Sequence, residues 1–132
     1  AGRVVEARRL WQRFNGIAGE DRELLRDPAF AADGPPPPFG WALTSGAAGV
    51  AERAPGGGLA ILHFGREPVM LARQLLILPA GGYRLRAEFT QAPESGRLEW
   101  RLQCVTGAGG ASVPADARPR EIAASAACPG YW

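Results

Sequence analysis

Two short runs near the middle of the chain alternate strictly between apolar and polar residues. In residues 83–89 the odd positions are apolar and the even positions are charged, whereas in residues 97–104 the even positions are apolar and the odd positions are polar. Successive side chains of a β-strand point to opposite faces of its sheet. Both runs therefore predict half-buried strands, each with one face in a core and one polar face toward solvent.

Apolar positions elsewhere predict one helix and several more strands. In residues 3–18 they recur at spacings of three and four, and Asn15-Gly16 is a stop signal. This pattern predicts a helix with the buried stripe Val4, Ala7, Trp11, Phe14 and Ala18. Strands are predicted at 24–30, 39–43, 50–53, 59–64, 73–78, 83–89, 96–105 and 121–125, with 106–118 as a loop.

This series of short strands predicts an all-β fold, an antiparallel β-sandwich of jelly-roll-like type with an N-terminal α-helix. We place the helix in residues 1–20, where it could also be the tail of an upstream region, and the sandwich in residues 21–132. The apolar faces of the strands supply the expected core: Trp41, Leu62, Phe64, Leu85, Phe89, Trp100 and Leu102.

Composition narrows the classes of partner. The chain has 132 residues, enough for one domain with a real core, and its net charge of +2 gives no argument for nucleic acid or an anionic membrane. It has no apolar run of about 18 residues, so we expect no membrane insertion. All the basic residues are Arg, which suggests a GC-rich bacterial genome. Because the first residue is not Met, we expect a piece of a longer protein with an adjoining domain.

The two cysteines bear on the cellular compartment. Cys104 closes a predicted strand, and Cys128 lies in a turn-like Ala-Cys-Pro-Gly segment that could fold back on it. We expect a Cys104–Cys128 disulfide, which implies maturation in an oxidising compartment and a periplasmic or extracellular location. The alternative is two buried thiols in a cytosolic protein.

Catalytic and metal-binding patterns are weak. His63 is the sole histidine, no Gly-x-Ser-x-Gly elbow is present, and one His with two distant Cys does not supply a zinc site. Glu88 and Glu99 could be neighbours on adjacent strands, as a glycosidase pair requires. Both lie among arginines, so cross-strand ion pairs explain them more simply. We expect a protein without enzymatic activity.

The order of several short motifs resembles that of jelly-roll carbohydrate-binding modules. The motifs are Asp-Pro-Ala-Phe (27–30), Pro-Phe-Gly-Trp (38–41), Gly-Leu-Ala-Ile-Leu (58–62), Arg-Gln-Leu (73–75) and Pro-Ala-Gly-Gly-Tyr-Arg-Leu (79–85). The chain is also similar to sandwich domains that follow helical repeats in some secreted proteobacterial proteins, which often carry a strand like Trp100–Cys104. The resemblance covers roughly residues 24–105 and implies a β-sandwich that binds glycans.

The resemblance also raises a structural calcium ion, which many such modules hold with carboxylate and carbonyl oxygens. Asp27 and Asp33 could contribute ligands. Asp27 replaces the usual Asn of the family pattern, and Ala31 stands where the pattern has Glu, which removes one carboxylate. We therefore expect no cofactor unless this reduced set still binds calcium.

One polar strand face is the candidate binding surface. By alternation it carries His63, Arg84, Arg86, Glu88, Arg97, Glu99, Arg101 and Gln103. Planar guanidinium and carboxylate groups make bidentate hydrogen bonds, which suits sugar hydroxyls and carboxylates. The residues expected to bind a glycan are His63, Arg84, Arg86, Glu99 and Arg101. Sugar sites usually add an exposed aromatic ring on which the sugar stacks, and Trp132 is the one Trp not assigned to the core or the helix. The alternatives are a solvated face of paired charges, or a structural domain that assembles with other proteins through the helix face around Trp11 and Phe14.

Overall fold

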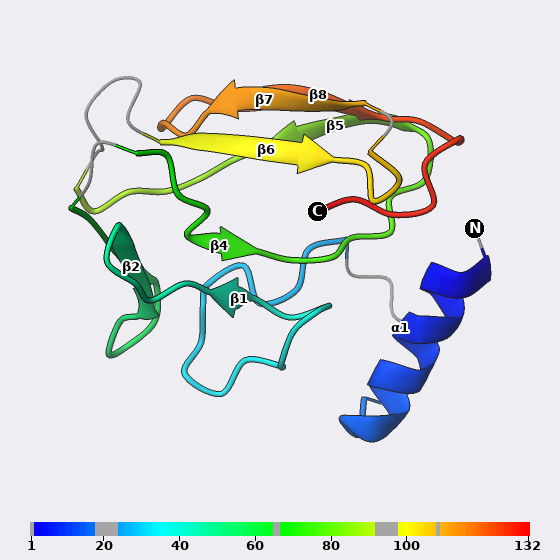
Figure 1. Ribbon diagram of the computed structural model, residues 1–132, viewed down its shortest axis with the longest axis horizontal. Helices are drawn as coiled ribbons and strands as arrows, with labels where there is room; N and C mark the ends of the chain where they lie inside the picture. The colour runs from blue at the N-terminus through cyan, green and yellow to red at the C-terminus, as the bar shows by residue number, and fades with distance from the viewer. Residues whose placement is uncertain (1, 18–23, 65–66, 92–97, 108) are drawn as a thin grey trace. The chain divides into compact units, whose positions relative to one another are not determined.

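The computed structural model describes residues 2–17, 24–64, 67–91, 98–107 and 109–132. The chain forms two compact units, and each is described by itself. The N-terminal unit comprises residues 5–76, and the C-terminal unit comprises residues 77–132 together with the first four residues. Figure 1 shows one helix followed by short strands, all of which pair antiparallel.

Helix α1 spans Gly2–Phe14 and is shorter than the predicted helix. It ends at the stop signal Asn15-Gly16, where Gly16 adopts a positive φ of 66° and the Asn15 side chain donates a hydrogen bond to the carbonyl of Trp11. The buried stripe is rotated from the predicted one. Trp11 is buried as expected, but its buried neighbour is Gln12, and Phe14 is 88% exposed.

The strands of the N-terminal unit form two antiparallel pairs. β1 (Ala42–Leu43) pairs with β4 (Ala72–Arg73), and β2 (Gly49–Arg53) pairs with β3 (Leu59–His63). β1 continues toward β2 through a hydrogen bond from the Ala51 N–H to the Thr44 carbonyl. The predictions at 50–53 and 59–64 are confirmed within one residue, whereas 39–43 keeps two strand residues and 73–78 keeps only Arg73.

The predicted strand at 24–30 is wrong. Asp27 and Phe30 both have positive φ, at 48° and 51°, which no extended strand allows. The Phe30 N–H donates to the Asp27 carbonyl, and the segment is a turn. Phe30, the last residue of this turn, is buried.

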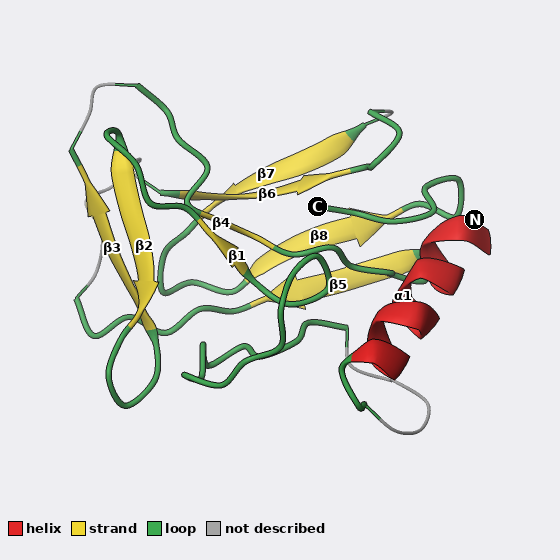
Figure 2. Cartoon of the chain, turned by 60° about the horizontal axis from the view of Figure 1, so that its bottom comes forward, coloured by secondary structure: helices red, strands yellow, loops and turns green. Residues whose placement is uncertain are grey.

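The C-terminal unit contains two longer antiparallel pairs. β5 (Gly81–Leu85) pairs with β8 (Arg120–Ala124), and β6 (Glu99–Gln103) pairs with β7 (Gly110–Pro114). β7 lies inside residues 106–118, which the sequence predicts as a loop. The prediction missed this strand because its Gly, Ala, Ser and Pro residues have low strand propensity. In Figure 2, β6 and β7 lie together and β5 and β8 lie together, as two separate pairs of ribbons.

The Cys104–Cys128 disulfide is confirmed, with Cα atoms 5.9 Å apart. It holds the last residues of the chain along β6. Gln103 and Trp132 exchange both of their backbone hydrogen bonds, and the Val105 N–H donates to the Gly130 carbonyl. Tyr131 thus forms a single antiparallel bridge to Cys104.

Alternation correctly predicts burial in the C-terminal unit and fails at one place in the N-terminal unit. Leu102 and Trp41 are buried as expected. The other expected core residues of the C-terminal unit, Leu85, Phe89 and Trp100, are half-buried. Leu62 and Phe64 are exposed, so their assignment to the core is wrong. Their strand face points away from the buried Ala51 side of the β2–β3 hairpin.

The chain is therefore mostly antiparallel strands with one N-terminal helix, as predicted. Among the residues that the structure describes, no sheet closes on itself, and each has two strands. The predicted domain boundary near residue 20 stays a prediction.

Candidate functional site

The five predicted glycan-binding residues lie on three separate strands or their ends. His63 ends β3 in the N-terminal unit, Arg84 lies in β5 with Arg86 just after it, and Glu99 and Arg101 lie in β6. β5 pairs with β8 and β6 with β7, so no strand pairing brings Arg84 beside Arg101. The structure joins Glu99 to Arg101 by an ion pair, and His63 belongs to the other unit.

Glu99 and Arg101 form an exposed ion pair on one face of β6. Nε and one terminal nitrogen of Arg101 donate to the same oxygen of Glu99, at 3.0 and 2.7 Å. On β5, Arg84 faces Glu121 of β8 in register, with 3.9 Å between their charged atoms. Exposed pairs of this kind typically contribute between about 0 and 1 kcal/mol. The polar strand faces thus carry charge pairs, although Glu99 pairs along its own strand rather than across strands.

His63 is exposed, and its ring makes a local contact. Its Nε2 donates a hydrogen bond of 3.0 Å to the carbonyl of Glu67, which fixes the proton on Nε2. Within the described part of the chain, no group of three or more His, Cys, Asp or Glu side chains is placed to hold a metal ion. Arg97 lies outside the described residues.

Asp27, proposed above as a calcium ligand, is instead the centre of a buried hydrogen-bond network. One carboxylate oxygen accepts the Ala31 N–H at 2.7 Å, and the other accepts a guanidinium N–H of Arg53 at 3.2 Å. The Asp27 carbonyl accepts the indole N–H of Trp41 at 2.9 Å. The two carboxylate oxygens thus tie the segment at residues 27–31 to Arg53 of β2.

A second buried network, which the sequence does not reveal, involves Gln74. This side chain is 3% exposed, and its amide exchanges two hydrogen bonds with the backbone of Arg26: the Arg26 N–H donates at 2.8 Å, and the Gln74 NH2 donates to the Arg26 carbonyl at 2.9 Å. The Gln74 amide thus replaces a neighbouring strand for the Arg26 backbone. No periodic pattern marks this residue, since it lies outside a regular strand.

The Arg26 side chain lies over the ring of Trp11, 4.8 Å from its centre. Burial lowers the pKa of Arg26, and the nearby positive charge of Arg8 lowers it further. The Trp11 indole N–H donates to the carbonyl of Pro36. These contacts attach helix α1 to the rest of the N-terminal unit through a cation–π contact and a hydrogen bond.

Four aromatic residues of the N-terminal unit are structural. Phe30 stacks on Trp41 with ring centres 4.7 Å apart, and Trp11 lies 5.5 Å from Phe39. All four rings are buried, so none is a stacking platform for a sugar.

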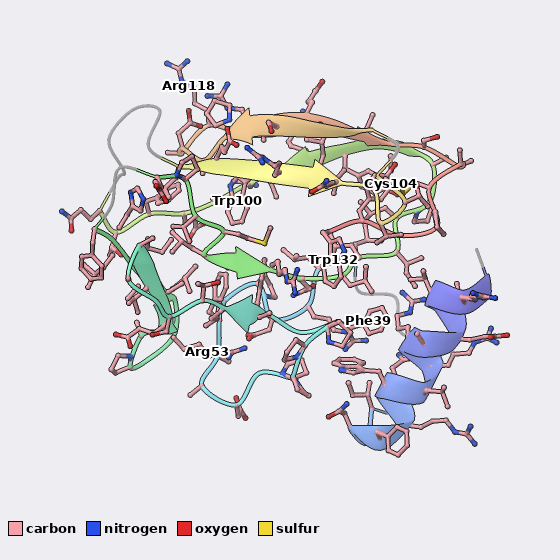
Figure 3. All side chains as sticks on the ribbon, viewed as in Figure 1. Phe39, Arg53, Trp100, Cys104, Arg118 and Trp132 are labelled. Atoms are coloured by element: carbon pink, nitrogen blue, oxygen red, sulfur yellow. A yellow bond between two sulfur atoms is a disulfide. The ribbon has the colours of Figure 1, made fainter. Side chains whose placement is uncertain are left out.

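In the C-terminal unit, Trp100 and Cys104 lie on the same side of the β6 segment (Figure 3). Trp100 is half-buried. Trp132, the one Trp without an assigned role in the sequence, is half-buried and continues the pairing along β6. Neither residue is a freely exposed ring.

The large apolar side chains that are exposed belong to one unit of the chain. All the large hydrophobic side chains that are exposed among the described residues belong to the N-terminal unit: Leu10, Phe14, Leu24, Leu62, Phe64 and Met70. The outer strand faces of the C-terminal unit are instead polar or charged, with Glu99, Arg101 and Glu121 exposed. The sequence hides part of this asymmetry, because Phe14, Leu62 and Phe64 fit a helix or strand pattern that normally indicates a core.

Comparisons with known proteins add no identity. No family model matches the chain, and neither a curated protein nor a solved structure matches it. In the described residues, no helix is long and apolar enough to cross a membrane. Function therefore has to be argued from the exposed surfaces.

Proposed function

We propose that this chain is a non-catalytic assembly module that binds other protein surfaces through its N-terminal unit. One observation carries the proposal: every large exposed hydrophobic side chain in the described residues lies in that unit. Scattered apolar residues on a surface need no explanation, but groups of them on one part of a soluble protein are typical of interaction sites.

Helix α1 supplies the first part of this surface. Leu10 and Phe14 are one helical turn apart and both exposed, so they project from the same side of the helix. Ala7, one turn before Leu10, is also exposed and extends this apolar strip. Trp11 is packed inside the unit, so the assembly face differs from the one predicted: it retains Phe14 and loses Trp11.

The first partner to test is a segment of the same polypeptide that adjoins this chain. The proposal also includes a jelly-roll-like sandwich arrangement of the strands and a periplasmic or extracellular location. The Cys104–Cys128 disulfide supports that location, because such bonds persist in oxidising compartments.

Sedimentation velocity of the chain mixed with the adjoining segment tests the proposal. We expect a complex that the Phe14→Glu variant weakens at least about tenfold, a loss of about 1.4 kcal/mol. Arg84→Glu, a change at another exposed side chain on β5, serves as the control and should leave the complex intact. A chain that stays alone in every mixture would contradict the proposal.

Glycan binding is the second candidate, favoured by the outer face of the β6–β7 pair. Glu99, Arg101 and Gln103 are exposed along β6, and Ser112 lies opposite Arg101 on β7 and is also exposed. These side chains offer several donors and acceptors on one face. A glycan array tests this candidate, with Arg101→Ala expected to weaken any signal and with Arg84, Arg86 and His63 as further positions to replace.

A further inference from the structure

The outer edge of strand β3 is built for backbone pairing. In the β2–β3 hairpin, the Phe64 N–H donates to Ala48 and the Ala54 N–H donates to Gly58. Backbone groups of an antiparallel strand point alternately toward and away from its partner, so the even-numbered residues of β3 face β2. The N–H and C=O groups of Leu59, Ile61 and His63 therefore point to the other edge. Among the described residues, no backbone hydrogen bond reaches them.

This edge lies on the outside of the N-terminal unit. β3 is paired to β2, and β2 in turn contacts β1, so β2 separates β3 from the rest of these strands. Figure 2 shows β3 outermost in the β2–β3 hairpin. The large apolar side chains along it are exposed, Leu62 at 59% and Phe64 at 63%, and the uncharged ring of His63 is exposed between them.

Other strands of the chain carry the usual protection against pairing with a further strand. Residues 130–132 cover part of the second edge of β6, β7 ends in Pro114, and β5 carries the exposed Arg84. Covering segments, proline and charge are the devices by which proteins block exposed edges. Residues 59–64 lack proline and charge: their sequence Leu-Ala-Ile-Leu-His-Phe contains no Pro and no Asp, Glu, Lys or Arg.

We propose that the β3 edge pairs with the β3 edge of a second copy of this chain, in an antiparallel two-fold dimer. The inference rests on the proposed assembly function and names one partner for it. A two-fold axis perpendicular to the sheet keeps each side chain on its own face, so opposite residues must have numbers that sum to an even value. A register centred on Leu62 meets this condition.

That register satisfies both the backbone and the side chains. Ile61 of one copy pairs with His63 of the other, and these residues hold the backbone groups that point outward. Leu62 meets Leu62 of the second copy, and Phe64 meets Ala60, so the exposed apolar side chains cover one another on one face. A charged residue near the two-fold axis would face the same residue of the second copy and be repelled by it. β3 carries no Asp, Glu, Lys or Arg.

The dimer is tested by sedimentation velocity of the full chain over a wide concentration range. We expect reversible dimerisation that Leu62→Arg abolishes over that range, because two like charges would stand directly opposite each other. Leu10→Arg is the matched control: the residue is 52% exposed in the same unit but lies on helix α1, and the dimer should persist. Near-identical circular dichroism of the two variants would show that both fold.

Oxidative cross-linking tests the register. Opposite residues at a non-hydrogen-bonded position have Cα atoms about 4.5 Å apart, within reach of a disulfide. The native cysteines are paired with each other, so Leu62→Cys adds the single free thiol. We expect Leu62→Cys to form a covalent dimer. Ala60→Cys places its thiol two residues from the axis and should form no covalent dimer under the same oxidation.

Three results would overturn the inference: a monomer at every concentration, a dimer that survives Leu62→Arg, or a dimer lost equally with Leu10→Arg. A chain that stays monomeric yet binds the adjoining segment would overturn the β3 dimer and leave the assembly function standing. A dimer that does not bind that segment would overturn the proposed contact through helix α1 and leave the β3 dimer standing. The two ideas can therefore fail separately.

Discussion

Replacing Gln74 by Ala removes the side chain that completes the backbone hydrogen bonding of Arg26. Gln74 is 3% exposed, and its amide both accepts from the Arg26 N–H and donates to the Arg26 carbonyl. Without it, two backbone groups lose their partner in a buried setting. Each buried unsatisfied group costs about 1–3 kcal/mol, so we expect a loss of about 2–5 kcal/mol in the free energy of unfolding.

Urea unfolding, followed by tryptophan fluorescence, measures this loss. Trp11 and Trp41 report on the N-terminal unit, and Trp11 packs against the Arg26 side chain. Gln103→Ala is the matched control, since this glutamine is exposed on β6 and surface changes usually shift stability by less than about 0.5 kcal/mol.

Gln74→Glu separates the two hydrogen bonds. A carboxylate can still accept from the Arg26 N–H but cannot donate to its carbonyl, and its charge is costly to bury, so a loss at least as large as that of Gln74→Ala is expected when the side chain is ionised. Equal unfolding free energies for Gln74→Ala and Gln103→Ala would refute the reasoning.

Three further outcomes follow from particular contacts. Gly34→Ala should destabilise by about 1–3 kcal/mol in chemical denaturation, because its new Cβ would overlap the Asp27 carboxylate beside Arg53, whereas Gly46→Ala, which meets open space, should not. Reducing the Cys104–Cys128 disulfide, whose residues are 24 apart in sequence, should lower the unfolding free energy by about 3 kcal/mol and speed hydrogen exchange at residues 130–132. Hydrogen bonding from Arg120, above all, lowers the pKa of Asp116, so the stability gained from this carboxylate is complete above its ordinary pKa of 3.8 and is lost as the pH falls; melting curves of Asp116→Asn should lack this acid-dependent part.

Period-two alternation predicted β6 and the alternating exposure of residues 83–89, although the strand there, β5, ends at Leu85 and β7 was missed. Tyr83, Leu85, Ala87 and Phe89 are all half-buried, with exposed residues between them. The same rule failed for Leu62 and Phe64, since alternation tells which side chains share a face and not which face another part of the protein covers. The disulfide was predictable because Cys128 lies in a turn-like segment that returns to the strand ending at Cys104.

The buried polar networks could not be predicted in the same way. Asp27 and Phe30 need positive φ, and single-sequence patterns favour that conformation clearly only for Gly or Asn. Gln74 acts on Arg26 across 48 positions of sequence, and no local propensity reports so distant a contact. The predicted glycan site had a related weakness: it assumed that β5 and β6 share a sheet, while each pairs with another strand.

Footprinting with hydroxyl radicals tests the assembly claim most directly, because it reports the exposure of individual side chains in the dilute and the assembled protein. The assembled state should protect Leu10 and Phe14 when the adjoining segment is bound, and Leu62 and Phe64 when the chain dimerises. Pro114, exposed on β7, should react equally in all states. Unchanged reactivity at all four apolar residues, with protection confined to the outer faces of β5 to β8, would contradict an assembly surface on the N-terminal unit.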